Sequence, residues 1–261
     1  MSIFFKLEKL VMQFGGLCAV NDFSIELKPG ELVGLIGPNG AGKTTVFNMI
    51  TGSLKPTSGR VLWQEEDVAG LPPHYIAARG IARTFQNIRL FGDMTVLENV
   101  MVSFHFRLKS SFWKAMTGLP SYGREERRIR AEALEFLEEM GLLHLANEKA
   151  SSLAYGQQRR LEIARALATR PKLLLLDEPA AGMNPPETRE LADLVRELRT
   201  KYDLTILLIE HDMKFVMGLC GRIQVLDYGI TIAAGSPAEI QCNPDVIRAY
   251  LGGEGDGQCL R

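Results

Sequence analysis

The sequence has 261 residues, of which 46% are hydrophobic and 23% are charged, proportions typical of a soluble globular protein and not of a disordered or fibrous one. Its 30 basic and 31 acidic residues give a formal net charge of -1. That balance excludes the global basic field that drives nucleic-acid binding. Apolar runs are only of buried-strand length, so we expect any membrane role to depend on a partner.

The first part of the chain alternates strand patterns with turn signals. Apolar runs at Ile25–Leu27 and Leu32–Ile36 predict two strands joined by a turn at Pro29–Gly30. A glycine-rich segment then leads into a helical pattern at Thr44–Ile50. A further run at Arg60–Trp63 predicts a strand at an antiparallel β edge. The order strand, loop, helix therefore opens the fold.

A helical region interrupts this order. In Arg124–Met140, apolar residues such as Ala133 and Leu137 recur at helical spacing, which predicts an amphipathic helix. A second helical pattern covers Arg159–Thr169. We expect residues 88–169 to form a helical subdomain inserted into the α/β fold.

After this region the chain returns to alternating strands and helices. Leu173–Leu176 and Thr205–Ile209 predict strands, and Glu187–Tyr202 and Met213–Leu219 predict helices. Strands that are apolar throughout indicate a mostly parallel sheet covered on both faces. We expect an α/β core made of residues 1–87 and 170–240, followed by a C-terminal segment, 241–261, that ends in a frayed tail.

One glycine-rich segment fits the pattern G-x-x-x-x-G-K-[ST] of a phosphate-binding loop, or P-loop. Glycines allow successive backbone N–H groups to turn toward phosphate oxygens, and the following helix adds its positive N-terminal end. Lys43 is expected to reach the β- and γ-phosphates, and the Thr44 hydroxyl to coordinate Mg²⁺. The predicted nucleotide-binding residues are Gly37, Pro38, Asn39, Gly40, Ala41, Gly42, Lys43, Thr44 and Thr45.

Two adjacent carboxylates end the strand that begins at Leu173. Asp177 is suited to the magnesium shell, and Glu178 lies where a general base that polarises water is expected. An acidic pair alone would fit a solvated loop equally well. Together with the upstream P-loop, in the order that the fold requires, the pair predicts nucleotide hydrolysis.

The ordered motifs resemble those of ABC ATPases over nearly the whole chain. The segments that carry this resemblance are Gly37–Thr44, Gln86, Leu153–Gln157, Leu173–Glu178 and His211. Other runs are similar to the ATP-binding subunits of high-affinity branched-chain amino acid importers. These runs are Arg83–Asn87, Leu153–Arg160, Asp177–Gly182, Ile209–Met213 and Asn243–Leu251. The resemblance implies a P-loop NTPase core with a mostly parallel sheet, an antiparallel β edge and a helical subdomain.

Three residues receive roles from the resemblance alone. It implies that Gln86 contacts the magnesium ion and the attacking water and links ATP to a transmembrane subunit. It implies that His211 contacts the γ-phosphate, and that the ring of Phe14 stacks on adenine. Without the resemblance, the ordinary interpretations are a surface Gln, a hydrogen-bonded His and a core Phe.

The family's signature motif is present in altered form as Leu153, Ala154, Tyr155, Gly156 and Gln157. Ala154 replaces a serine whose hydroxyl would bond the γ-phosphate, and Tyr155 replaces a glycine. The resemblance implies that this signature closes over ATP held by a second subunit. Asn184 stands where the family often has aspartate, so communication across such a pair is expected to differ in detail.

The resemblance implies an ATPase that needs ATP and Mg²⁺, with Lys43, Gln86, Glu178 and His211 as catalytic residues. The implied partners are a second ABC ATPase subunit, identical or different, two transmembrane permease subunits and an extracytoplasmic substrate-binding protein, with no nucleic acid. The implied location is the cytoplasmic face of the inner membrane. Branched-chain amino acids are the expected cargo. Related importers of urea, amides or aromatic acids remain alternatives, as does a soluble ABC ATPase without a transport role.

Overall fold

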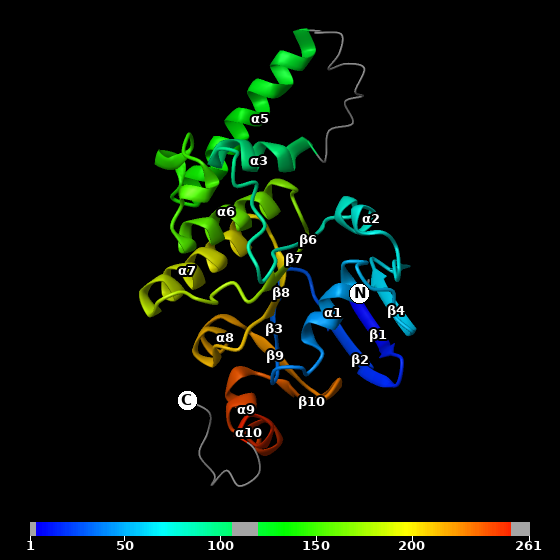
Figure 1. Cartoon of the computed structure of the whole chain (residues 1–261). Coiled ribbons are helices and arrows are strands. Elements are labelled where there is room, and N and C mark those ends of the chain that lie inside the picture. Colours follow the sequence, from blue (N-terminus) through cyan, green and yellow to red (C-terminus); the bar gives the residue numbers. More distant parts are fainter. Residues whose placement is uncertain (1–3, 106–119, 252–261) are drawn as a thin grey trace. The chain divides into compact units, whose positions relative to one another are not determined.

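A computed structural model describes residues 4–105 and 120–251 of the chain. The chain forms two compact units (Figure 1). Met1–Arg83 and Lys172–Arg261 make the first, here called the core unit, and Thr84–Pro171 makes the second, the helical unit. Each unit is described by itself. The frayed tail expected beyond Gly252 lies outside the described residues.

A six-stranded sheet organises the core unit. Its strand order is β10-β9-β3-β8-β7-β6, and β3, β6, β7, β8 and β9 run parallel to their neighbours while β10 pairs antiparallel with β9. The strands are β3 (Leu32–Ile36), β6 (Ile81–Arg83), β7 (Leu173–Asp177), β8 (Thr205–Ile209), β9 (Arg222–Asp227) and β10 (Ile230–Gly235). The sequence prediction of a mostly parallel sheet is confirmed.

Helices cover both faces of this sheet because its central strands are apolar on both sides. On one face α1 (Lys43–Ile50) buries Val46 and Phe47 in a cluster with Val33 of β3 and residues of β7 and β8. On the other face α8 (Met213–Leu219) approaches so closely that a side chain at Gly34 would lie 3.1 Å from Val216. The α7 helix (Pro185–Lys201) buries an apolar stripe that includes Leu191, Val195 and Leu198.

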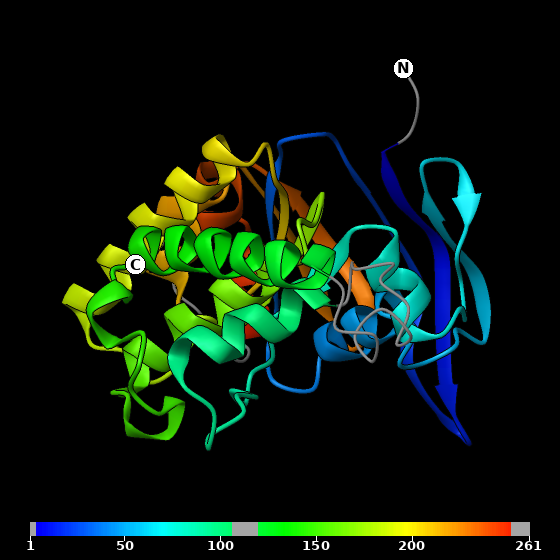
Figure 2. The ribbon, with the colours of Figure 1, turned by 90° about the horizontal axis from the view of Figure 1, so that it is seen from above.

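A separate antiparallel sheet packs against the opposite side of α1 (Figure 2). Its order is β2-β1-β4-β5, and its strands are β1 (Phe5–Phe14), β2 (Leu17–Leu27), β4 (Ser58–Trp63) and β5 (Glu66–Asp67). The sequence predicted only parts of β2 and β4. It missed β1 because the register shifts between Leu7 and Leu10, where Lys9 takes a positive φ of 47°, and this bulge breaks the alternation of buried residues.

Three short helices complete the core unit. They are α2 (Pro73–Ala78), α9 (Pro237–Gln241) and α10 (Pro244–Leu251). Ser236 caps α9 by accepting a hydrogen bond from the backbone N–H of Glu239, and Val246 of α10 is fully buried. The C-terminal segment as far as Leu251 therefore folds as part of the core unit.

The helical unit contains α3 (Val96–His105), α5 (Pro120–Glu139) and α6 (Tyr155–Ala168), with 3-10 turns at Leu143–Leu145 and Ala150–Ser152. The predicted stripe is buried, with Ala133, Leu137 and Met140 at 0% exposure. The helix expected at Arg159 begins earlier, at Tyr155, because the Gln157 side chain accepts a hydrogen bond from the backbone N–H of Ala154 and stabilises the first turn.

No helix among residues 4–105 and 120–251 is both long enough and apolar enough to cross a membrane.

Asn184 caps the N-terminus of α7, which explains why an asparagine fits where the family often has an aspartate. Its Oδ1 accepts a hydrogen bond from the backbone N–H of Glu187 at 3.0 Å, and the Glu187 carboxylate accepts from the N–H of Asn184 at 3.0 Å. Asparagine and aspartate both serve as helix N-caps, so the departure from aspartate preserves this capping function.

We predict that Asn184→Ala lowers the free energy of unfolding by about 1 kcal/mol because the first turn of α7 loses its acceptor. Denaturant unfolding followed by circular dichroism measures the change. Asn184→Asp keeps the acceptor and is the matched control. Equal losses in the two variants would contradict the capping role.

Candidate functional site

The glycine-rich loop between β3 and α1 has a backbone that only glycine fits. Gly37, Gly40 and Gly42 have φ values of 151°, 81° and 104°. A Cβ on Gly37 would lie 1.9 Å from the carbonyl oxygen of Leu226 in β9, and one on Gly42 would lie 2.5 Å from that of Ala19 in β2. The loop therefore lies so close to β9 and β2 that side chains at Gly37 and Gly42 have no room.

Lys43 begins α1 and turns back across this loop. Its side chain is buried, and Nζ donates to the carbonyl oxygens of Gly37 at 2.6 Å and Pro38 at 2.9 Å. Burial lowers the pKa of the Lys43 ammonium, while the charges of Glu178 and Asp177 act in the opposite direction. The ammonium therefore lies within the electrostatic field of both predicted acidic residues.

The rest of the predicted loop is open to ligands. Asn39, Gly40 and Thr44 are exposed, and Thr45 is half-buried in the first turn of α1. A helix N-terminus presents backbone N–H groups that have no partner within the helix, together with the positive end of its dipole. The loop and this first turn consequently bring together backbone N–H donors suited to phosphate oxygens.

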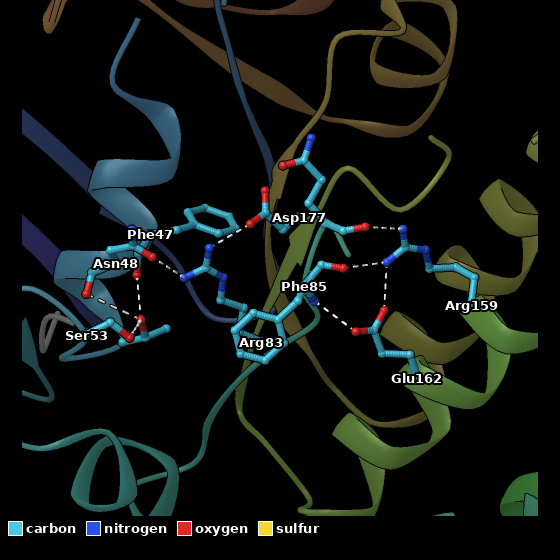
Figure 3. A network of polar contacts seen from close by, with 10 residues as sticks. Phe47, Asn48, Ser53, Arg83, Phe85, Arg159, Glu162 and Asp177 are labelled. Atoms are coloured by element: carbon cyan, nitrogen blue, oxygen red, sulfur yellow. Dashed lines mark hydrogen bonds and ion pairs between the residues drawn. The ribbon is translucent and has the colours of Figure 1, made fainter. Parts of the chain in front are cut away.

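Asp177 ends β7 and lies in a buried polar network (Figure 3). The Arg83 guanidinium donates to Oδ2 of Asp177 at 2.7 Å and to Oδ1 of Asn48 in α1 at 2.7 Å. The Arg83 and Asp177 side chains are only 7% and 4% exposed, and Arg83 also lies over the ring of Phe47. Arg83 therefore fixes the carboxylate relative to the helix that follows the phosphate loop.

Glu178 follows with a strained backbone. Its φ of 47° is rare for a residue other than glycine, and its N–H donates to the carbonyl oxygen of Ile209 at 2.9 Å. Nδ1 of His211 lies 3.6 Å from Oε1 of Glu178, and these side chains are 54% and 15% exposed. The predicted base and the residue predicted to contact the γ-phosphate are thus neighbours just beyond the ends of two adjacent strands.

Glu210 holds the backbone of two segments in place, the one after Glu178 and the one that carries His211. It is buried, and its carboxylate accepts hydrogen bonds from the backbone N–H of Ala180 at 2.8 Å and of His211 at 3.0 Å. Burial raises the pKa of Glu210, and these N–H donors work against the increase. One buried carboxylate consequently connects the segment after Glu178 to the one that carries His211.

Two aromatic residues of the core unit stand apart from the charged groups. Phe14 ends β1 opposite Leu17, and its side chain is 46% exposed, so a flat apolar ligand can reach its ring. Tyr250 in α10 has a buried hydroxyl, and burial, with a further contribution from Asp227, raises its pKa to about 12. The nearby backbone N–H of Gly37 opposes this increase. The C-terminal helix thus reaches the start of the phosphate loop.

In the helical unit, α6 holds the segment around Gln86. Arg159, which is fully buried, donates to the carbonyl oxygens of Phe85 at 2.6 Å and Gln86 at 3.0 Å. Glu162 accepts from Arg159 at 2.7 Å and from the backbone N–H of Phe85 at 3.0 Å (Figure 3). Because α6 begins at Tyr155, the signature and the Gln86 segment belong to one hydrogen-bonded structure.

The signature residues surround the first turn of this helix. Leu153 is buried and Ala154 is exposed, and Tyr155 is 44% exposed. Gly156 and Gln157 lie within the first turn and are half-buried. Since Ala154 has no side-chain acceptor, this helix end presents backbone N–H groups and its dipole as the features that attract an anion.

The sequence analysis assigned no role to four charged residues that lie in these networks. Arg83, Glu210, Arg159 and Glu162 all lie inside or beside motifs, yet each acts through backbone or side-chain contacts between distant segments. One sequence signal could have identified these four residues. Each is a charged residue at the end of an apolar strand or on the apolar face of a helix, where burial requires a partner.

The donors of the core unit fit a nucleotide triphosphate with a hard divalent cation. The glycine-rich loop and Lys43 contain N–H and ammonium donors of the kind that bind phosphate, and Thr44 and Asp177 carry oxygen atoms of the kind that Mg²⁺ prefers. No cluster of three His, Cys, Asp or Glu side chains suited to a metal occurs within the described part of the chain. Mg²⁺ commonly binds through few protein oxygens together with phosphate and water.

A P-loop core of this topology, with an inserted helical unit that carries a signature helix, defines an ABC-type ATPase. The "ABC transporter" family profile matches residues 20–181, and that of the "Branched-chain amino acid ATP-binding cassette transporter" matches residues 231–256. The chain belongs to the ABC transporter family, as one of its ATP-hydrolysing subunits.

The chain is also similar to named relatives along nearly its full length. It is 55% identical over 243 residues to the high-affinity branched-chain amino acid transport ATP-binding protein LivG of Escherichia coli K12, covering 93% of this chain and 95% of LivG. The ADP conformation of MJ1267, an ATP-binding cassette of an ABC transporter, superposes with a TM-score of 0.83 at 34% identity, covering 97% and 99% of the two chains. A dimeric post-hydrolysis state of the cassette MJ0796, bound to ADP and Pi, gives a TM-score of 0.76 at 27% identity, covering 89% and 98%.

We predict that Gly37→Ala weakens ATP binding by more than about tenfold, because the new methyl group forces the loop or β9 to move and adds left-handed backbone strain. Gly40→Ala is the matched control, since a Cβ there meets nothing within 4 Å and only the strain of its φ of 81° applies. Titration with a fluorescent ATP analogue measures both affinities. Equal losses would show that the contact with Leu226 does not shape the site.

Proposed function

We propose that this chain is the ATP-hydrolysing subunit of an importer for branched-chain amino acids. The observation that carries the hydrolytic part is the position of Glu178 directly after β7, with its Oε1 3.6 Å from Nδ1 of His211. The similarity to LivG and the match of the C-terminal residues 231–256 support the choice of cargo. The chain itself needs no contact with the amino acid.

In the proposed reaction the phosphate loop and Lys43 bind the ATP phosphates, and Phe14 stacks on the adenine. Glu178 accepts a proton from the attacking water, and its strained backbone and the nearby His211 orient it toward the γ-phosphate. Thr44 and Asp177 of the core unit would hold Mg²⁺, which neutralises phosphate charge when bound. Glu210 keeps the segments of Glu178 and His211 in place.

The residues Leu153–Gln157 act in this proposal on ATP bound by a second ABC ATPase subunit, identical or different. The N-terminus of α6 supplies backbone N–H groups and the helix dipole in place of the serine hydroxyl that Ala154 lacks. The dimeric state of the related cassette MJ0796 supports a paired arrangement. ATP binding joins the two subunits and hydrolysis lets them separate.

We place the pair at the cytoplasmic face of the inner membrane, on two transmembrane permease subunits that receive cargo from a substrate-binding protein. Gln86 and its neighbours transmit the closing of the pair to the permeases. Importers of urea, amides or aromatic acids would need the same ATPase chemistry, so only the cargo distinguishes them from this proposal.

We expect Glu178→Gln to lower ATP hydrolysis by about a hundredfold or more while ATP still binds, because the variant keeps the shape of the side chain and loses the base. Lys43→Ala removes a buried phosphate-binding charge and should weaken ATP binding itself. Phosphate release and ATP titration separate the two effects. Glu135→Gln makes the same chemical change on an exposed helix position and serves as the control. Unchanged turnover in Glu178→Gln would rule out the base assignment.

The cargo and partners are tested by co-purification of the tagged chain from its native membranes. We expect two permease subunits and a sister ATPase, and stimulation of ATP hydrolysis in the reconstituted complex by binding protein loaded with leucine. Stimulation by urea, amides or aromatic acids alone would change the cargo. Ribosomal or DNA-repair proteins in place of permeases would overturn the transport role.

A further inference from the structure

Tyr155 and the Gln86 segment share one buried arginine within the helical unit. Nη2 of Arg159 donates to the Tyr155 hydroxyl at 3.2 Å and to the carbonyl oxygen of Gln86 at 3.0 Å. Arg159 also lies near the face of the Tyr155 ring, with its guanidinium carbon 5.9 Å from the ring centroid. The same nitrogen therefore contacts the signature residue and the residue proposed to link ATP with the permease.

The charged side chains of the network are buried and lie fully within the helical unit. Arg159 and Glu162 are 0% and 5% exposed and pair at 2.7 Å, and together they engage both backbone polar groups of Phe85. Separating a buried ion pair leaves an uncompensated charge, so this part of the network is expected to move as one piece. The hydrogen bond from Arg159 to the hydroxyl of the half-exposed Tyr155 is longer, at 3.2 Å. This bond links the buried network to the first turn of α6.

We propose that Tyr155 is a positioning residue: its hydroxyl fixes the Arg159 guanidinium, and Arg159 in turn fixes the carbonyls of Phe85 and Gln86. A phosphate that engages the first turn of α6 displaces Tyr155, and the shared guanidinium passes this displacement to the Gln86 segment. The tyrosine that replaces a signature glycine thereby connects the partner-bound ATP to Gln86 of its own chain. This inference rests on the proposed role of Leu153–Gln157 at the second ATP.

The connection between the signature and Arg159 requires a side chain as large as that of Tyr155. Tyr155 and Arg159 are four residues apart on α6, so their side chains lie on the same face of the helix. A glycine at 155 would give the guanidinium no partner on that side. The aromatic ring supplies both the reach and the polar end, and the hydroxyl hydrogen is not used in accepting from Arg159.

Hydrogen exchange of the Phe85 amide reports this network directly, because that N–H donates to Glu162. In the purified chain we expect Tyr155→Phe, which keeps the ring and loses the hydroxyl, to speed exchange of this amide about fivefold. Tyr75→Phe is the matched control, since Tyr75 is 53% exposed in α2 of the core unit. An unchanged rate in Tyr155→Phe would overturn the proposal.

The same exchange measurement in the reconstituted complex, trapped with ATP by Glu178→Gln, tests transmission. We expect ATP to protect the amides of residues 153–157 and to change exchange of the Phe85 amide, and Tyr155→Phe to remove the second effect while keeping the first. Protection of residues 153–157 without any response at Phe85 would refute the connection and leave the signature role intact. If ATP protected neither region, the signature role and the connection would both be wrong.

Discussion

Parallel pairing of β3 with β8 and of β8 with β7 is the constraint on which the catalytic site depends. It brings the carboxyl ends of three strands to one edge of the sheet, where the phosphate loop follows β3, Asp177 ends β7 and His211 comes shortly after β8. These strands are apolar on both faces, so helices must cover both sides, and α1 is packed where its N-terminus completes the loop. Hydrophobic burial thus determines where the polar chemistry occurs.

Charge at this edge is held by buried partners, since an isolated buried charge is costly. Arg83 pairs with Asp177, Lys43 donates to loop carbonyls, and Glu210 accepts backbone N–H groups from two loops. Each partner orients a neighbouring group that we propose to act on ATP. The left-handed backbone at Glu178 belongs to the same pattern, because its N–H bond to Ile209 holds an otherwise unfavourable conformation.

The segment that contains Gln86 is anchored at its two ends by different arginines. Arg83, at the end of the core unit, pairs with Asp177, whereas Arg159 in the helical unit holds Phe85 and Gln86. Only a few residues of chain separate these anchors. The short segment that carries Gln86 therefore follows an arginine paired within the core unit, and within the helical unit it is hydrogen-bonded to the helix that begins at Tyr155.

Local signals in the sequence were enough to predict the phosphate loop, the acidic pair at the end of β7, the mostly parallel sheet and the amphipathic helices, because glycine spacing, apolar runs and helical periodicity are read from neighbouring residues. The resemblance added Phe14, Gln86, the signature and His211. The roles of Arg83, Glu210, Arg159 and Glu162 became visible in the folded chain, because each contacts backbone or side chains distant in sequence. It also revealed β1, whose bulge at Lys9 hides the strand period, and placed α10 beside the start of the phosphate loop. Such features depend on which segments pack together, and no local pattern encodes that.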